Sequence, residues 1–332
     1  MYGVDVSKET LDICLYVNKV QGKIQFLNRK EGFRDFLQWA KSQPDGTDSA
    51  CCFEATGRYH EEFADFLVEH GFKAYPVSGY SISCYRKALL QRSKTDAGDA
   101  EIIAQFGEAH QNSLYCYQPI SKARKTLKTL ARTRSTFTQQ QTRIKNQIGS
   151  LTGSSTDSST RKLLRKSLRS IGRQIDSLDK EMRKVIQGDL ELCIMDDVIR
   201  SIPGISYISS SRILAELPMN SKSVRAWDQY AGLVGCANES GTSVHHRPRC
   251  SVVSNARLRT ALYMPAVAVS KMDNPLGAFY RRLHEDARKE KMVAINALMR
   301  KLLHIVFGVL KHLEPYNPDL VGPLASKNER VS

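Results

Sequence analysis

Short apolar segments rich in β-forming residues alternate with amphipathic segments along the first 110 residues of the chain. The pattern predicts strands at 2–6, 11–17, 23–27, 49–54 and 72–76, with a hairpin turn at Val20-Gln21-Gly22. Apolar residues at intervals of three and four predict helices at 32–41, 59–70, 81–90 and 96–109. This order of elements predicts a mixed α/β domain over residues 1–112.

Four acidic residues in this domain can converge on one point. Asp5 and Glu54 each end a predicted strand, and adjacent strands lie about 4.8 Å apart. Asp96 and Asp99, in KTDAGDA, share one face if that segment is helical. Four such acids cannot all ionise together without a cation, and a hard divalent ion prefers oxygen ligands. Each acid alone is more typical of a solvated strand end or helix start, but together they predict a metal site.

Residues 119–192 form a strongly basic segment with two helical stripes. Thirteen Lys and Arg lie between Ser121 and Arg169, against one acid, Asp157. A Gly/Ser-rich break at 152–159 separates the two stripes. The stripes predict a long antiparallel helical hairpin, open to coiled-coil packing with a second subunit. Its charge favours contact with phosphates over a merely solvated face, giving affinity and salt dependence without sequence selection.

The remaining segment, 196–320, is predicted to be mainly helical, with a tail at 321–332. Helices are expected at 210–216, 258–271, 276–290 and 293–313. The Pro203-Gly204 turn could present backbone N–H groups to a phosphate or simply connect two helices, and both interpretations stay open.

Ser240 stands in a polar, Gly-containing loop that is followed by basic side chains, namely His245, His246, Arg247 and Arg249. A loop serine is usually a turn residue. It is also sterically open to attack a phosphate, and neighbouring cations could stabilise the developing charge. Chemistry alone leaves both interpretations open.

Composition restricts the partners. The formal net charge of +15 favours a polyanion, nucleic acid before an anionic membrane surface. No apolar run approaches the roughly 20 residues of a membrane span, and the N-terminus lacks the pattern of a signal peptide, so a cytoplasmic protein is expected. The eight cysteines include no CxxC pair, which leaves a zinc site little support and favours small buried hydrophobes.

Several motifs carry a family resemblance. GVDVSKETLD, FEATGRYH and KTDAGDA, in this order and spacing, resemble the N-terminal motifs of the IS110 (Piv/MooV, DEDD-type) insertion-sequence transposases. YAGLVGCANESG and NARLRTALYMPAVAVSKMDNPLGAFYRRL resemble their C-terminal transposase domain. The resemblance implies a RuvC/RNase H-like fold for residues 1–112. It also implies that Asp5, Glu54, Asp96 and Asp99 are the metal ligands and that Ser240 is the nucleophile.

The function implied by this resemblance is that of an RNA-guided DNA transposase or recombinase. Mg²⁺ held by the four acids would polarise the scissile phosphate, and Ser240 would attack phosphorus, forming a covalent DNA link that conserves bond energy for rejoining. The implied partners are donor and target DNA, and a structured guide (bridge) RNA encoded beside the gene. A homodimer or homotetramer would supply a composite active site, with residues from different subunits. The resemblance implies no membrane partner and a location in the bacterial cytoplasm, at the nucleoid while the enzyme acts on DNA.

Two alternatives from other classes remain open. A RuvC-like, metal-dependent junction nuclease would need the four acids but no serine. A non-catalytic nucleic-acid-binding protein would need neither. The chain also departs from the family in two places: Ser251-Val252-Val253-Ser254 replaces a Ser-Lys-x-Gly pattern, and Arg288-Lys289 replaces a Gly-Lys.

Overall fold

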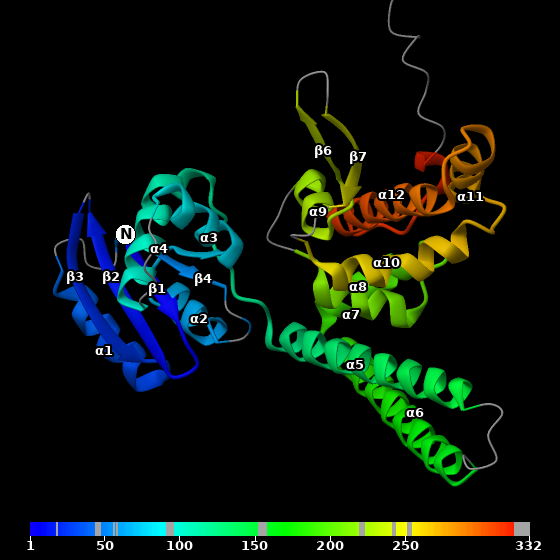
Figure 1. The fold of residues 1–332 in the computed structure, drawn as a ribbon, viewed down its shortest axis with the longest axis horizontal. Coiled ribbons are helices and arrows are strands. Elements are labelled where there is room, and N and C mark those ends of the chain that lie inside the picture. The colour runs from blue at the N-terminus through cyan, green and yellow to red at the C-terminus, as the bar shows by residue number, and fades with distance from the viewer. Residues whose placement is uncertain are drawn as a thin grey trace, which may run out of the picture. The chain divides into compact units, whose positions relative to one another are not determined.

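The computed structural model describes residues 1–17, 19–43, 48–55, 57, 59–90, 96–151, 158–218, 223–240, 244–250 and 254–321 (Figure 1). The chain divides into two compact units, Met1–Pro119 and Ile120–Ser332. The predicted tail lies almost entirely outside the described residues, as do the departures at 251–253.

The first unit contains a five-stranded mixed sheet with the strand order β3-β2-β1-β4-β5. Its strands are β1 (Tyr2–Val6), β2 (Thr10–Val17), β3 (Lys19–Leu27), β4 (Cys51–Glu54) and β5 (Ala74–Val77). β1, β2 and β3 are antiparallel neighbours, whereas β4 and β5 continue the sheet parallel to β1. The expected strands are therefore all present.

The predicted turn at Val20-Gln21-Gly22 is wrong. These residues belong to β3, where Val20 pairs with Tyr16 and Gly22 with Leu15. The pairing register shifts between Leu15 and Tyr16, so a β-bulge accommodates the change. The glycine suggested a turn, but it lies in the strand and a Cβ there would meet only the Trp39 ring, at 3.8 Å.

Helices cover both faces of this sheet. One face packs against α1 (Lys30–Lys41) and α2 (Glu61–Glu69) through a core that includes Tyr2, Val4, Phe36 and Phe63. The other face packs against α3 (Gly79–Ala88) and α4 (Asp96–His110). Successive strand residues point to opposite faces, so Tyr2 and Val4 face the first core while Gly3 and Asp5 face α4.

α4 approaches β1 very closely. A Cβ on Gly3 would lie 2.2 Å from the Ala100 carbonyl oxygen and 2.3 Å from the Ala104 nitrogen. Gly107, further along α4, is next to Cys52 and Met1. The helix therefore runs opposite to β1, and its first turn points toward the carboxyl end of that strand.

The second unit begins with two long helices, α5 (Lys122–Ser150) and α6 (Ser158–Gln187), which pack side by side (Figure 1). Their buried residues are confined to the half near the rest of the unit: Leu127, Ala131, Ile175, Met182 and Ile186. Further out, Ile144, Leu164 and Leu168 are half-buried and Leu163 is 67% exposed. The predicted pair of long helices is confirmed.

A helical body follows, joined by one β-hairpin. Its elements are α7 (Leu190–Arg200), α8 (Tyr207–Glu216), α9 (Val224–Ala231), β6 (Gly235–Ser240), β7 (Val244–Cys250), α10 (Ala256–Val269), α11 (Pro275–Arg281), a π-helical turn at Arg282–Asp286 and α12 (Lys291–His312). The hairpin was not expected from the sequence. The helix predicted at 276–290 ends earlier, at Arg281.

The Pro203-Gly204 turn packs against α10. Gly204 has φ +81°, and a Cβ there would lie 2.3 Å from Val269 Cγ2 and 3.1 Å from the Pro265 carbonyl oxygen. This close packing against a neighbouring helix favours the interpretation as a helix connection over a phosphate-binding turn.

α12 is long and apolar enough to span a membrane by length and composition alone. This corrects the expectation that no apolar run approaches that length. Eight of its residues are buried in the core of the second unit: Ala294, Ile295, Leu298, Met299, Leu302, Leu303, Val306 and Val309. It packs against α7, α9, α10 and α11 within that core.

Candidate active site

The carboxyl ends of β1 and β4 bring Asp5 and Glu54 together. Val4 and Phe53 pair in the parallel ladder, so the two acids stand one residue further along neighbouring strands, about 4.8 Å apart at the backbone. Both residues are half-buried, and both lie on the sheet face that α4 covers. The structure therefore places these two predicted ligands side by side.

The N-terminus of α4 brings Asp96 toward the same end of the sheet. Asp96 is the first residue of the helix and precedes Ala100, which contacts Gly3, by about one turn. Because α4 runs opposite to β1, its first turn lies on the side of Asp5. The Asp96 side chain lies outside the described part of the chain.

Asp99 already has a cationic partner. Arg86 Nη2, from the last turn of α3, donates to Asp99 Oδ1 at 2.5 Å, and the two side chains are only 17% and 11% exposed. Arg86 Nε is also buried and has no hydrogen-bond acceptor among the described residues. A metal ligand role for Asp99 therefore requires this guanidinium to share the carboxylate or to move.

Glu54 lies against the first residue of α3. A Cβ on Gly79 would come within 2.4 Å of Glu54 Oε1, so the missing side chain leaves room for the carboxylate. Ser78 caps this helix through a hydrogen bond from the Ser81 nitrogen, 3.1 Å long. The same helix thus contacts Glu54 at its start and Asp99 near its end.

Asp12 is an acid that the sequence pattern did not single out. It lies directly opposite Asp5 in the antiparallel β1–β2 ladder, so the two side chains share a face. Asp12 Oδ1 accepts from Gln25 Nε2 at 2.9 Å. Asp12 is the last residue of the GVDVSKETLD motif, but only the strand register reveals that it opposes Asp5.

The donor chemistry of this region suits a hard cation. Its candidate ligands are all carboxylates, and Asp5 and Glu54 are adjacent and half-buried. Within the described side chains, no three acids, histidines or cysteines form a cluster that could hold a metal. The described acids thus supply a pair at the strand ends plus Asp99, which Arg86 binds, and the place of the Asp96 carboxylate stays a prediction.

Ser240 is the last residue of β6, where it pairs with Val244 of β7. The sequence predicts a loop at this serine, but the structure has a β-hairpin there, which projects from the helical body (Figure 1). The side chains of 236–240 and 244–250 lie outside the described part of the chain, which includes His245, His246, Arg247 and Arg249.

Hydrogen bonds hold the two ends of this hairpin together at its base. The Asn255 nitrogen donates to the Tyr230 carbonyl oxygen at 2.6 Å. Arg259 Nη1 donates to the Ala231 carbonyl oxygen at 3.0 Å and to Ser254 Oγ at 2.8 Å. Gly232, with φ +67°, is packed so closely that a Cβ would lie 2.4 Å from Ser254 Oγ. These hydrogen bonds and this close packing therefore hold the two ends of the hairpin in one position on the helical body.

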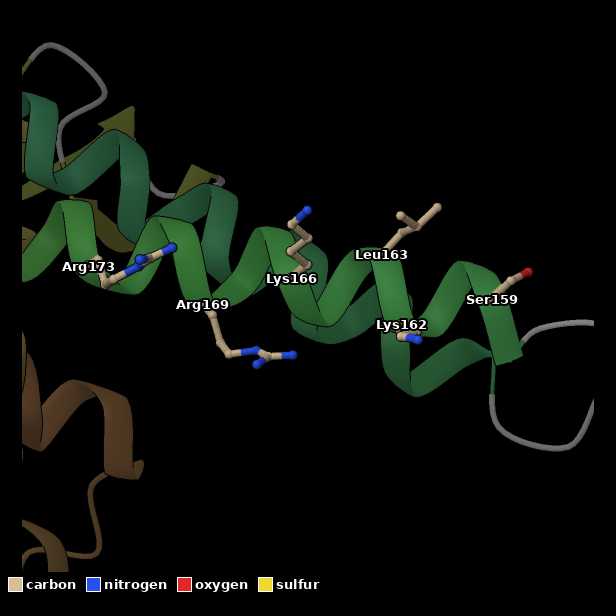
Figure 2. Close-up of a pocket in the computed structure, with 6 residues that line it drawn as sticks. All are labelled: Ser159, Lys162, Leu163, Lys166, Arg169 and Arg173. Atoms are coloured by element: carbon tan, nitrogen blue, oxygen red, sulfur yellow. The ribbon is translucent and has the colours of Figure 1, made fainter.

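A row of cations follows the outer part of α6. Lys162, Lys166, Arg169 and Arg173, with Ser159 and Leu163, line a surface groove of about 980 Å³. Figure 2 shows their side chains extending from successive turns of the helix. Lys162 and Arg173 are eleven residues apart, a rise of about 16 Å. In the described part of the chain, none of these four cations has an acidic partner.

Charge is divided along α6. From Ser158 to Arg173 the helix carries no acid, whereas Asp176, Asp179 and Glu181 follow in its inner part. Asp179 pairs with Arg134 of α5, and Glu181 with Lys184. Acids therefore accompany the cations in the inner part of α6, whereas the described outer part carries none, which leaves its cations available for a polyanion.

Comparison with known proteins gives matches in both units. Residues 2–152 match a transposase family model for DEDD-type domains of IS110 elements, and residues 196–281 match the model described as transposase IS116/IS110/IS902 family. The chain is also 29% identical to the pilin gene-inverting proteins of Moraxella bovis and Moraxella lacunata. Each of these matches spans 319 residues, 95% of this chain and 97% of the relative.

Proposed function

Because the chain belongs to the IS110 family of transposases and is a DNA recombinase, we propose that it moves an insertion sequence by serine-mediated strand exchange under RNA guidance. The observation that carries this proposal is the pair Asp5 and Glu54 at the ends of neighbouring strands, with the first turn of α4 directed toward them. A DEDD-type domain is typically dependent on a divalent metal ion. The strand order and the antiparallel-then-parallel pairing support a RuvC/RNase H-like fold for residues 1–112.

In this proposal, Asp5, Glu54, Asp96 and Asp99 hold Mg²⁺. When bound, the metal would supply Lewis-acid polarisation of the scissile phosphate. The chain's own residues provide the setting: half-buried Asp5 and Glu54 are fixed by the strands, Gly79 leaves space for Glu54, and Arg86 holds Asp99. Asp5 and Glu54, fixed by the strands, would then position a hard cation with little rearrangement, whereas Asp99 would have to share its carboxylate with Arg86 or be released by it.

Ser240 is the proposed nucleophile. Its hydroxyl oxygen would form a bond to phosphorus while the bond from phosphorus to the leaving DNA oxygen breaks, and the proton lost by the serine hydroxyl would balance the one gained by that leaving oxygen. The resulting phosphodiester to the protein conserves the bond for rejoining to a second strand. Support comes from the family's serine-glycine motif and from the supported base of the hairpin that carries Ser240.

We also propose donor DNA, target DNA and a structured guide RNA as partners. The outer cations of α6 support phosphate contact without distinguishing DNA from RNA. The family's composite active centre, with carboxylates and serine from different subunits, would require a homodimer or homotetramer, and the half-buried outer seam of α5 and α6 supports pairing through a coiled coil. Residues 119–192 and 196–320, which share one hydrophobic core, would then supply different functions within one unit of a cytoplasmic enzyme.

The proposal is tested by searching for a covalent protein–DNA adduct on a denaturing gel. Wild-type protein, Ser240→Ala and Asp5→Asn are compared with donor DNA, flanking noncoding RNA and Mg²⁺. The serine mechanism predicts an adduct for wild type only. Cleavage that persists in Ser240→Ala without an adduct would identify a metal-dependent nuclease instead. Unchanged activity of Asp5→Asn without Mg²⁺ would remove the metal site.

The relatives' name suggests inversion as a second recombination outcome. The Moraxella proteins are described as inverting a pilin gene, and their match extends over nearly the whole chain. A plasmid carrying the element's ends in inverted orientation separates inversion from insertion, because only inversion exchanges the intervening segment in place.

A further inference from the structure

A buried carboxylate connects the long helix α5 to the base of the hairpin that carries Ser240. Glu216, the last residue of α8, is 5% exposed. It accepts from Arg132 of α5 through two hydrogen bonds, Nε to Oε1 at 2.7 Å and Nη2 to Oε2 at 2.9 Å. It also accepts from Asn255 Nδ2 at 2.9 Å. One carboxylate therefore joins two elements that are far apart in the sequence.

Asn255 uses all of its polar atoms in this arrangement. Besides its bond to Glu216, Nδ2 donates to the Tyr230 hydroxyl at 2.8 Å. Oδ1 caps α10 by accepting from the nitrogens of Arg257 and Leu258, at 3.0 and 3.1 Å. Its backbone nitrogen closes the hairpin base through Tyr230. Asn255 therefore connects Glu216 to both ends of the hairpin.

A second contact connects α5 to the end of α8. Arg124 Nε donates to the Leu214 carbonyl oxygen at 3.2 Å, and Arg124 Nη2 donates to that of Leu217. Burial lowers the pKa of this guanidinium from its ordinary value. α5 therefore holds the end of α8 from two positions, Arg124 and Arg132, two turns apart.

We propose that Glu216 is a positioning residue that couples nucleic acid bound on the α5–α6 pair to the orientation of the Ser240 hairpin. The role of Ser240 rests on the proposed function, whereas the mechanical connection from Arg132 to Asn255 does not. Buried ion pairs whose remaining acceptors are satisfied hold one arrangement of the elements they join. The ligand sensed by α5 and α6 is a phosphate backbone, by the charge of their outer parts.

Two isosteric substitutions test the connection. Glu216→Gln keeps the size of the side chain but removes the charge that orients Arg132. Asn255→Asp keeps a good helix cap while replacing the donor to Glu216 with a like charge. The matched control is Arg134→Gln, which also removes a bidentate arginine pair from α5, but to Asp179 of α6 and away from the hairpin base.

Amide hydrogen exchange at the hairpin base is the readout that does not depend on activity. The relevant amides are that of Asn255, which donates to the Tyr230 carbonyl oxygen across the base, and those of Gly232 and Leu233, which donate to the Gln229 and Asp228 carbonyl oxygens where α9 ends beside it. We expect exchange about tenfold faster in Glu216→Gln and Asn255→Asp than in Arg134→Gln, with variants compared at equal global stability by adjusting urea. A DNA duplex should slow this exchange in wild type, and less so in Glu216→Gln.

The functional readout separates positioning from binding. At saturating donor DNA and guide RNA, Glu216→Gln should form the Ser240 adduct about tenfold more slowly while its DNA Kd stays within about twofold of wild type. Amide exchange at the hairpin base that is no faster in Glu216→Gln than in Arg134→Gln would overturn the proposed coupling. If amide exchange at the hairpin base is faster in Glu216→Gln but wild type forms no adduct, the coupling is retained and Ser240 is rejected as the nucleophile.

Discussion

Arg86 Nη2 lies 2.5 Å from Asp99 Oδ1, so α3 supplies an internal cation to one of the four acids assigned to metal binding. Both side chains are largely buried. A guanidinium and a metal ion compete for the same lone pairs when both are close to one carboxylate. The affinity of the proposed metal site should therefore depend on Arg86, which is not one of its proposed ligands.

Replacing Arg86 with Gln should make the first unit depend more on metal. Loss of the charge-assisted bond should lower stability in EDTA by about 2 kcal/mol. Mg²⁺ should then raise stability more in the variant than in wild type, because it no longer displaces a competitor. Urea unfolding with and without Mg²⁺ measures both effects. An equal increase in the free energy of unfolding on adding Mg²⁺ to the two proteins would contradict this competition.

The control for Arg86 is Arg29→Gln. Arg29 pairs with Glu31, but these side chains are 65% and 68% exposed. An exposed pair contributes about 0–1 kcal/mol, so its loss should change neither stability nor the response to Mg²⁺ appreciably.

Gly3→Ala should separate α4 from the sheet. The added methyl would meet backbone atoms of Ala100 and Ala104, which cannot rotate away as a flexible side chain can. We expect a loss of about 3 kcal/mol and a loss of metal-dependent activity, since α4 carries Asp96 and Asp99. Gly22→Ala, whose Cβ would meet only the Trp39 ring at 3.8 Å, should change unfolding by less than about 1 kcal/mol. Similar urea midpoints for both variants would show that α4 tolerates displacement.

Removing the outer cations of α6 should weaken nucleic-acid binding in a salt-dependent way. A variant with Lys162, Lys166, Arg169 and Arg173 changed to Gln should bind duplex DNA more weakly. The slope of log K against log salt should become shallower by about 0.9 for each phosphate that the variant no longer neutralises. Lys184→Gln is the control, because Lys184 pairs with Glu181 on the same helix. An unchanged slope in the fourfold variant would place the phosphate-binding cations elsewhere.

Glu216 should make stability fall in acid. Burial raises the pKa of Glu216, but hydrogen bonds from Arg132 and Asn255 outweigh it, so its pKa lies below the ordinary value. Its contribution is then present above the unfolded pKa of about 4.3 and is lost as pH falls through the lower folded value. Urea unfolding from pH 6 down to pH 3 should show a shallower loss for Glu216→Gln than for wild type. Parallel pH profiles would exclude this carboxylate as the source.

Much of the first unit follows from local pattern. Each expected strand and helix there is present because apolar periodicity decides which face is buried, and Asp5 and Glu54 are adjacent because parallel strands end together. The predicted turn at Val20-Gln21-Gly22 is wrong because a glycine can lie inside a strand where a bulge changes the register. Position in the sheet decided its conformation, and that is not a local property.

Partners distant in the sequence were not predictable. Arg132 and Glu216 are 84 residues apart, and nothing near either residue marks the other. The pairing of Asp99 with Arg86 likewise depends on how two helices pack. The β6–β7 hairpin was missed because its sequence is polar and rich in histidine and arginine rather than alternating. The sequence pattern therefore predicts a loop at Ser240, where the structure has the end of a strand.

The closed base of the hairpin has a consequence for engineering and for divergence among relatives. Contacts between residues 230–232 and 254–259 tie its two ends to the helical body. We therefore expect that the arm between those ends can be exchanged or lengthened as a unit while the helices keep their packing. Chimaeras that graft this arm from one relative onto another should fold, and the reach of the arm can vary independently of the scaffold that bears it.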